Sequence, residues 1–206
     1  MSRELRIGII GVGGMGGRHA YNLHSRVGGT QVTAVVDPDS ERAANVAAVS
    51  GALVLADGEA LIASPEVDAV VIASPDPTHA SFAISCLEHG KPALVEKPLA
   101  TTLDDAAIVV EREAALGHRL LQVGFMRRYD PQHLAVARAV GDGVIGRPLL
   151  LRGWHRNPPE PAPPSSADVL IKAAVHDFDT ARWLLGDDIA EVSVHGTTID
   201  PGRTDL

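Results

Sequence analysis

The sequence is poor in cysteine and in aromatic residues, and it contains no long apolar run. A single cysteine, Cys86, stands among 206 residues, which excludes an internal disulfide and favours a buried structural thiol. Aromatic residues make up 3%, so Ala, Val, Leu and Ile must build the core. No apolar run approaches the roughly 20 residues that span a bilayer. With no signal-peptide core at the N-terminus, we expect a cytoplasmic protein without a membrane partner.

The chain also lacks an excess of positive charge. Lys and Arg number 18 against 26 Asp and Glu, and the net charge is -8 at pH 7. Proteins that bind nucleic acids need a basic face to displace counterions, so this class is disfavoured. Hydrophobic residues make up 45% and charged residues 21%, which is typical of a globular protein. A protein that handles small molecules is the expectation.

Short apolar runs alternate with helical patterns along the first 123 residues. The runs that predict strands are 5–10, 31–36, 53–54, 69–73, 93–95 and 120–123. The stretches that predict helices are 15–25, 40–50, 77–89 and 103–115. Runs without polar alternation suit a parallel sheet that helices cover on both faces. The alternation therefore predicts an α/β fold, a Rossmann-type doubly wound parallel sheet over residues 1–123.

The pattern changes after residue 123. Helices are predicted over 130–140 and 168–185, the second ending at Gly186, and strands over 147–155 and 189–196. Five prolines place 157–164 in a loop. Two strands alone make a poor sheet. Residues 124–206 therefore predict an incomplete α+β second domain, for substrate and oligomer contacts.

A glycine-rich turn joins the first predicted strand to the first predicted helix. Gly11, Gly13 and Gly16 form the pattern GxGxxG, with Gly14 and Met15 between them. The first glycine permits the tight turn, the second allows the backbone to approach a diphosphate, and the third allows close packing of helix on strand. Because the helix N-terminus carries partial positive charge, the turn predicts a dinucleotide site.

An acidic residue follows the second predicted strand, where such sites bind the ribose. The Asp37 carboxylate can accept both ribose hydroxyls and would repel the additional phosphate of NADP, so NAD is the predicted cofactor. Arg42, about one helical turn further on, leaves NADP as an alternative.

Two further loops follow predicted strands at the ligand edge of the sheet. Ser74 and His79 belong to the loop after 69–73, which either contacts the cofactor or simply begins a helix. Glu96, Lys97 and Pro98 follow 93–95. A lysine there can donate a hydrogen bond to a substrate hydroxyl and join a proton relay.

The glycine turn, the acidic residue, the Ser74 to His79 loop and Glu96-Lys97-Pro98 occur in the order and spacing of the Gfo/Idh/MocA oxidoreductases. The chain resembles this family through residues 1–199. The segments around Arg127, around His155 and Asn157, and around His176 are similar to its inositol 2-dehydrogenase branch. The resemblance implies NAD-dependent oxidation of a cyclic polyol, with sugar dehydrogenation as the rival within the family.

The resemblance also implies roles for individual residues. Lys97 would bind and polarise the reacting hydroxyl, and His176 would take its proton. Arg127, His155 and Asn157 would line the polyol pocket. Each of these residues also has a structural alternative: His176 as a core histidine, Arg127 as surface charge, and His155 and Asn157 as strand-end hydrogen-bonding groups. The implied cofactor residues are Gly11, Gly13, Gly14, Met15, Gly16, Asp37, Ser74, His79 and Glu96, and no metal is implied.

The chain departs from the family in two ways. Lys172, four residues before His176, occupies a position that is usually aspartate. A lysine there favours neutral imidazole, with Asp179 as a substitute orienting group and Asp168 as a partner for the lysine. Family members also run well beyond 300 residues, which predicts a truncated product or fragment that exposes apolar surface and either self-associates or is unstable. A non-catalytic NAD-binding protein is therefore the alternative to the enzyme.

Overall fold

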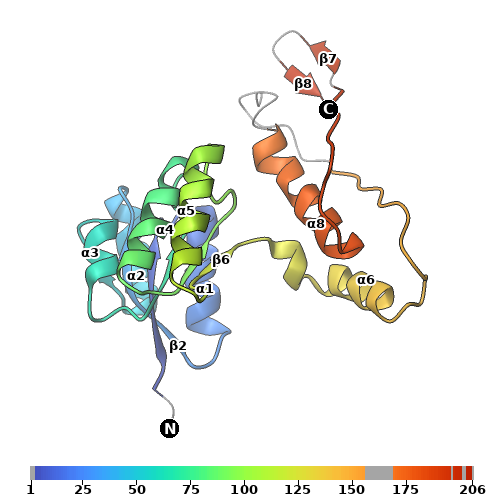
Figure 1. Ribbon diagram of the computed structural model, residues 1–206. Helices are drawn as coiled ribbons and strands as arrows, with labels where there is room; N and C mark the ends of the chain where they lie inside the picture. The colour runs from blue at the N-terminus through green and yellow to red at the C-terminus, as the bar shows by residue number, and fades with distance from the viewer. Residues whose placement is uncertain (1–2, 156–168, 196, 201–202, 206) are drawn as a thin grey trace. The chain divides into compact units, whose positions relative to one another are not determined.

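The computed structural model describes residues 3–155, 169–195, 197–200 and 203–205. The chain divides into two compact units, Met1–Gly124 and Phe125–Leu206, and Figure 1 shows their elements with labels on many of them. None of the helices in the described ranges is long and apolar enough to cross a membrane.

The first unit contains a six-stranded sheet in the order β3-β2-β1-β4-β5-β6. Every pairing in it is parallel. The strands are β1 Leu5–Ile10, β2 Thr30–Val36, β3 Leu53–Val54, β4 Ala69–Ile72, β5 Ala93–Val95 and β6 Leu121–Val123. The segment after β1 crosses one face of the sheet, and the segment after β4 crosses the other face. The ligand crevice of this topology therefore opens between these two strands. The predicted doubly wound α/β fold is confirmed.

Five α-helices connect the strands of the first unit. They are α1 Gly14–Ser25, α2 Ser40–Ser50, α3 Gly58–Ala63, α4 His79–Glu88 and α5 Leu103–Ala115, with a short 3-10 turn at Asp76–Thr78 before α4. Side chains cap several N-termini: Asp39 accepts from the Arg42 amide, Asp57 from the Ala60 amide, and Thr102 from the Asp105 amide. Helix α3 has no counterpart in the sequence prediction, because six residues are too few for a helical period to emerge.

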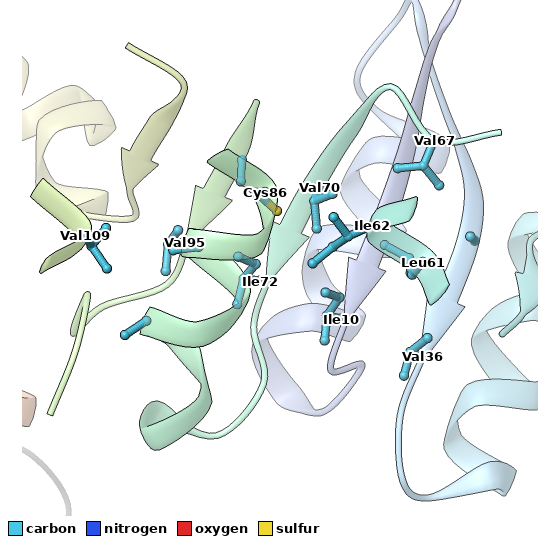
Figure 2. Close-up of a cluster of buried hydrophobic side chains, with 14 residues drawn as sticks. Ile10, Val36, Leu61, Ile62, Val67, Val70, Ile72, Cys86, Val95 and Val109 are labelled. Carbon is cyan, nitrogen blue, oxygen red and sulfur yellow. The ribbon is translucent and has the colours of Figure 1, made fainter. Parts of the chain in front are cut away.

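The two faces of the sheet have separate apolar cores. One core, drawn in Figure 2, joins β-strand side chains to Leu61 and Ile62 of α3, Cys86 of α4 and Val109 of α5. The other joins the sheet to α1 and α2 through residues such as Ala20 and Ala43. Helices therefore cover both faces, which is why the strands read as apolar runs. The prediction for Cys86 as a buried thiol is confirmed: the residue has 0% exposure, and burial raises its pKa to about 12.

Where it is described, the second unit contains more helix than strand. Its elements are the 3-10 helix η2 Met126–Tyr129, α6 Pro131–Gly141, the π-helix η3 Val169–Ala174, α8 Val175–Leu185, and the antiparallel pair β7 Thr197–Asp200 and β8 Arg203–Asp205. Helix α8 ends at Gly186 with φ of 68°, as predicted. Residues 157–164 lie outside the described ranges.

The strands predicted over 147–155 and 189–196 are wrong. Residues 147–155 and 189–195 form no strand, and residue 196 is not described. Apolar residues in both segments are exposed, for example Leu149 at 88% and Val192 at 53%. A strand exists only where another strand accepts its hydrogen bonds. In the described parts of the chain neither segment pairs with a strand.

Candidate functional site

The glycine loop after β1 is held in a conformation that larger residues would block. Gly11 has φ of +83°, and a Cβ on it would lie 2.6 Å from the Ala73 carbonyl oxygen. A Cβ on Gly16 would lie 1.8 Å from the Gly11 carbonyl oxygen. By contrast, nothing lies within 4 Å of a Cβ on Gly14. The space above the loop is therefore open where a diphosphate would sit, and the packing beneath it is tight.

The N-terminus of α1 is open to a ligand. Gly13 is the N-cap residue and supplies no side-chain hydrogen bond. Gly14 and Met15 are exposed at this end of the helix. The first amides of a helix have no partner within it, so they can donate to an anion. The loop and helix together have the shape and polarity that a dinucleotide diphosphate requires.

Asp37 follows β2 and lies beside this loop. Its Oδ2 accepts from the Val12 amide at 2.8 Å, and its Oδ1 accepts from the Asp39 amide at 2.9 Å. The Asp37 side chain is 5% exposed, and Arg42 Nη1 lies 3.6 Å from Oδ1. Because each carboxylate oxygen has two lone pairs, Asp37 can order the loop and still accept from a ribose. No pattern in the sequence indicates this ordering role.

Arg42 reaches toward the glycine loop from α2. A Cβ on Gly13 would lie 3.6 Å from Arg42 Nη1. The guanidinium also lies 3.3 Å from the Asp39 carboxylate. Two carboxylates thus offset the charge of Arg42, which weakens its ability to attract a ribose phosphate.

The loop after β4 contains Ser74, whose hydroxyl is hydrogen-bonded to Thr78 Oγ1 at 2.6 Å. His79, at the start of α4, is 1% exposed. Its Nε2 lies 2.8 Å from the Ser74 carbonyl oxygen, and its Nδ1 lies 2.7 Å from that of Pro98. Both ring nitrogens therefore face backbone oxygens of the protein.

The loop after β5 carries Glu96, Lys97 and Pro98, with a cis peptide bond between the last two. Glu96 Oε1 is 2.8 Å from His19 Nε2 on α1. Burial raises the pKa of Glu96, but hydrogen bonds from His19 and the Lys97 amide and the nearby positive charges outweigh it, so the pKa is lowered. Lys97 is partly buried at the carboxyl end of the sheet. The structure thus brings the loops after β1, β4 and β5 to one edge.

In the second unit, Asp177 joins two of the residues implied in substrate binding. Arg127 Nη1 donates to Asp177 Oδ1, and His155 Nδ1 lies 3.3 Å from Asp177 Oδ2. Burial raises the pKa of Asp177, but Arg127 and His155 outweigh it and lower the pKa. Asp177 was not among the predicted site residues, although its position next to His176 in the sequence was a signal.

His176 lies in α8 and is 6% exposed. The centre of its ring is 6.4 Å from that of Phe125 and 6.3 Å from that of His155. The hydroxyl of Thr180 donates to the His176 carbonyl oxygen at 2.6 Å. His155 and His176 thus lie near each other within this unit, whereas Asn157 lies outside the described residues.

The surroundings of His176 differ from the sequence expectation at two positions. Asp179, proposed as a substitute orienting group, accepts from Arg128 at 3.0 and 2.8 Å. Lys172 is exposed and belongs to the π-helix η3. Hydrogen bonds in a π-helix run from i to i+5, so the turn that joins Lys172 to His176 is wider than the α-helical turn assumed from the sequence. Asp168 lies outside the described residues.

Comparison with known proteins gives matches along most of the chain. Residues 5–125 match the family described as "Oxidoreductase family, NAD-binding Rossmann fold". Residues 133–206 match the "GFO/IDH/MocA C-terminal domain".

Several curated relatives are named as inositol 2-dehydrogenases. The chain is 54% identical over 200 residues to inositol 2-dehydrogenase of Rubrobacter xylanophilus, covering 97% of this chain and 58% of the relative. It is 45% identical over 194 residues to inositol 2-dehydrogenase 4 of Saccharopolyspora erythraea, covering 94% and 57%. The chain therefore spans somewhat more than half the length of these relatives.

A solved structure also resembles the chain. Myo-inositol dehydrogenase from Lactobacillus casei, in complex with NAD(H) and myo-inositol, has a TM-score of 0.84 and 35% sequence identity. The match covers 89% of this chain and 55% of that one.

Proposed function

The chain belongs to the Gfo/Idh/MocA oxidoreductase family, and we propose that it binds NAD and transfers a hydride between this cofactor and a cyclic polyol or sugar. The observation that carries the proposal is the glycine loop, where the Gly11 turn and the Gly16 contact leave an uncapped helix N-terminus beside Asp37. Polyols of the inositol class are favoured because relatives at 54% and 45% identity are named inositol 2-dehydrogenases.

In this proposal the first unit holds the cofactor. Backbone amides of the glycine loop bind the diphosphate, and the Asp37 carboxylate accepts from the ribose hydroxyls. The loops after β4 and β5 support the nicotinamide end. The residues concerned are Gly11, Gly13, Gly14, Met15, Gly16, Asp37, Ser74, His79 and Glu96.

The proposed chemistry assigns two residues to the reacting hydroxyl. NAD, when bound, accepts the hydrogen on the reacting carbon as a hydride. The Lys97 ammonium donates a hydrogen bond to the hydroxyl oxygen, and the His176 imidazole takes the hydroxyl proton as the carbonyl forms. Arg127, His155 and Asn157 bind the other hydroxyls of the substrate.

A second candidate function is NAD binding without turnover. The observation that favours it is Lys172, an exposed residue of η3. The inositol 2-dehydrogenase branch, which this chain resembles, usually has aspartate at this position. A carboxylate there would favour the protonated imidazole that proton abstraction produces, whereas a lysine opposes it. This binder would share the cofactor site and lack the proton relay.

The experiment that separates the two candidates combines binding with turnover. Calorimetry with NAD and NADP tests the cofactor site, and absorbance of the reduced cofactor follows turnover with inositols and aldoses. We expect NAD binding, and turnover that rises in Lys172→Asp. An absence of heat with either cofactor on folded protein would reject both candidates. Binding without turnover in the native chain and in Lys172→Asp would select the binder.

The proposal also includes a cytoplasmic location and assembly with further copies of the chain. The lone Cys86, buried as a thiol, fits a reducing compartment. Exposed apolar residues of the second unit, such as Leu149 and Leu150, offer surface for assembly.

A further inference from the structure

The residues on both sides of Lys97 are each held by a histidine. Glu96 Oε1 lies 2.8 Å from His19 Nε2, and the Pro98 carbonyl oxygen lies 2.7 Å from His79 Nδ1. We propose that His19 and His79 are positioning residues that fix Lys97 relative to the two cofactor loops. The inference rests on the proposed function in taking Lys97 as the residue that binds the reacting hydroxyl.

His19 connects Lys97 to the glycine loop. It lies on α1, the helix that this loop begins. Its partner Glu96 has a side chain that is 12% exposed, and the Glu96 carboxylate also accepts from the Lys97 amide. The same carboxylate approaches Gly124, where a Cβ would lie 3.3 Å from Glu96 Oε2. A shielded carboxylate between a histidine and the Lys97 backbone restricts where Lys97 can lie.

His79 connects Lys97 to the loop after β4. Its Nε2 faces the Ser74 carbonyl oxygen at 2.8 Å, while its Nδ1 faces the Pro98 carbonyl oxygen. The ring is 1% exposed, so water has little access to replace either contact. A buried carbonyl oxygen that loses its donor costs free energy, and the ring lies within hydrogen-bond distance of one such oxygen in each of the β4 and β5 loops.

The two histidines come from helices that follow different cofactor loops. A ligand that orders the glycine loop orders α1 and His19, and a ligand that orders the Ser74 loop acts through His79. Both effects reach the backbone of the same lysine. This arrangement gives Lys97 a fixed place when the cofactor is bound, which a lysine on a free loop would lack.

Lysine NMR tests the proposal directly. The chain has three lysines, Lys91, Lys97 and Lys172, so reductive ¹³C-methylation gives few signals, and Lys97→Arg assigns one of them. We expect His19→Leu to move the Lys97 signal by more than its linewidth and to leave the Lys91 and Lys172 signals in place. His19→Gln, which retains an N–H donor for Glu96, is expected to restore much of the native position. His24→Leu is the matched control, because His24 is an exposed histidine of the same helix.

The His79 contacts are tested on the native protein, because a variant of such a buried residue can fail to fold. We expect a downfield imidazole N–H proton on His79 that exchanges slowly with water. A rapidly exchanging His79 ring would overturn its part of the proposal. A Lys97 signal that responds equally to His19→Leu and His24→Leu, in variants that melt like the native chain, would overturn the proposal that His19 positions Lys97. The spectra need no cofactor, so a failure to bind NAD would reject the proposed function alone.

Discussion

At the scale of single residues, position along the chain identified the side chains at the ligand edge but not the bonds they make. Asp37 was predicted as a ribose acceptor, and it also accepts from the Val12 and Asp39 amides. His79 was predicted as a cofactor residue, and both of its ring nitrogens face backbone carbonyls. The contacts of Asp37 with Val12 and of His79 with Pro98 join residues 25 and 19 positions apart in the sequence, and no local pattern encodes them.

The cofactor preference is expected to depend on Asp37 and Arg42 together. Asp37→Ser removes a ribose acceptor and frees the guanidinium, which now lies 3.6 Å from that carboxylate. We expect NAD affinity to fall about tenfold, the equivalent of roughly one hydrogen bond, while NADP affinity rises. Calorimetry with both cofactors measures the ratio. Asp39→Ser serves as the control, since it removes the other partner of Arg42 and keeps the ribose acceptor. An unchanged ratio in Asp37→Ser would contradict this account.

The acid sensitivity of the first unit is expected to depend on Asp68. The side chain and backbone amide of Arg6 donate hydrogen bonds to it, and they hold its pKa well below the usual value despite some desolvation. Because the pKa is lower in the folded state, the stabilisation is complete at neutral pH. It is lost as pH falls below the unfolded value of about 3.9.

Melting temperatures between neutral pH and pH about 3 test this role. We expect Asp68→Asn to melt below the native chain at neutral pH, with the difference shrinking as the pH falls. Glu66→Gln is the control, because its ion pair with Arg6 has a Glu66 side chain that is 62% exposed, and such pairs contribute little. Equal melting of Asp68→Asn and the native chain at neutral pH would rule out the role.

At the scale of elements, the sequence predicts those helices and strands whose own residues form a clear apolar pattern. The predicted bounds of β1, α2, β5 and α5 coincide with the structure. The two predicted strands of the second unit are wrong because a strand-like sequence shows only that a segment can pair. Helix α3 was missed, although Asp57 caps it and a Cβ on Gly58 would lie 2.4 Å from the Phe82 ring. That close packing on α4 is a tertiary contact.

The glycine loop provides a matched pair of variants at this scale. Gly16→Ala forces a Cβ to within 1.8 Å of the Gly11 carbonyl oxygen, so the loop or α1 must shift. We expect a large drop in melting temperature and loss of NAD binding. Gly14→Ala meets no atom within 4 Å and replaces glycine by a better helix former, so its melting temperature should equal or exceed the native value. Calorimetry and thermal melting of both variants decide the matter. Equal stability of the two variants would show that the contact beneath Gly16 is not limiting.

At the scale of the whole molecule, both apolar cores belong to the first unit. The described residues of the second unit contribute Leu184 and three polar residues, His176, Asp179 and Thr180, to the buried set. A parallel sheet was predictable because each strand is apolar along its length. The part of the candidate site that lies in the second unit was less predictable than the sheet. It depends on ion pairs such as those of Asp177 and Asp179.

This uneven burial predicts uneven protection of backbone amides from hydrogen exchange. Amides of β1, β4 and β5 lie in a paired, covered sheet, whereas residues 147–155 and 189–195 form no strand and expose Leu149, Leu150 and Val192. We expect exchange in the central strands to be at least roughly 100-fold slower, since opening them requires unfolding of the core. NAD should slow exchange in the glycine loop and α1. Mass spectrometry of peptic fragments measures both effects across protein concentrations. Protection of 147–155 that rises with concentration would show that a second copy covers these apolar residues, and protection equal to that of β4 at high dilution would contradict the prediction.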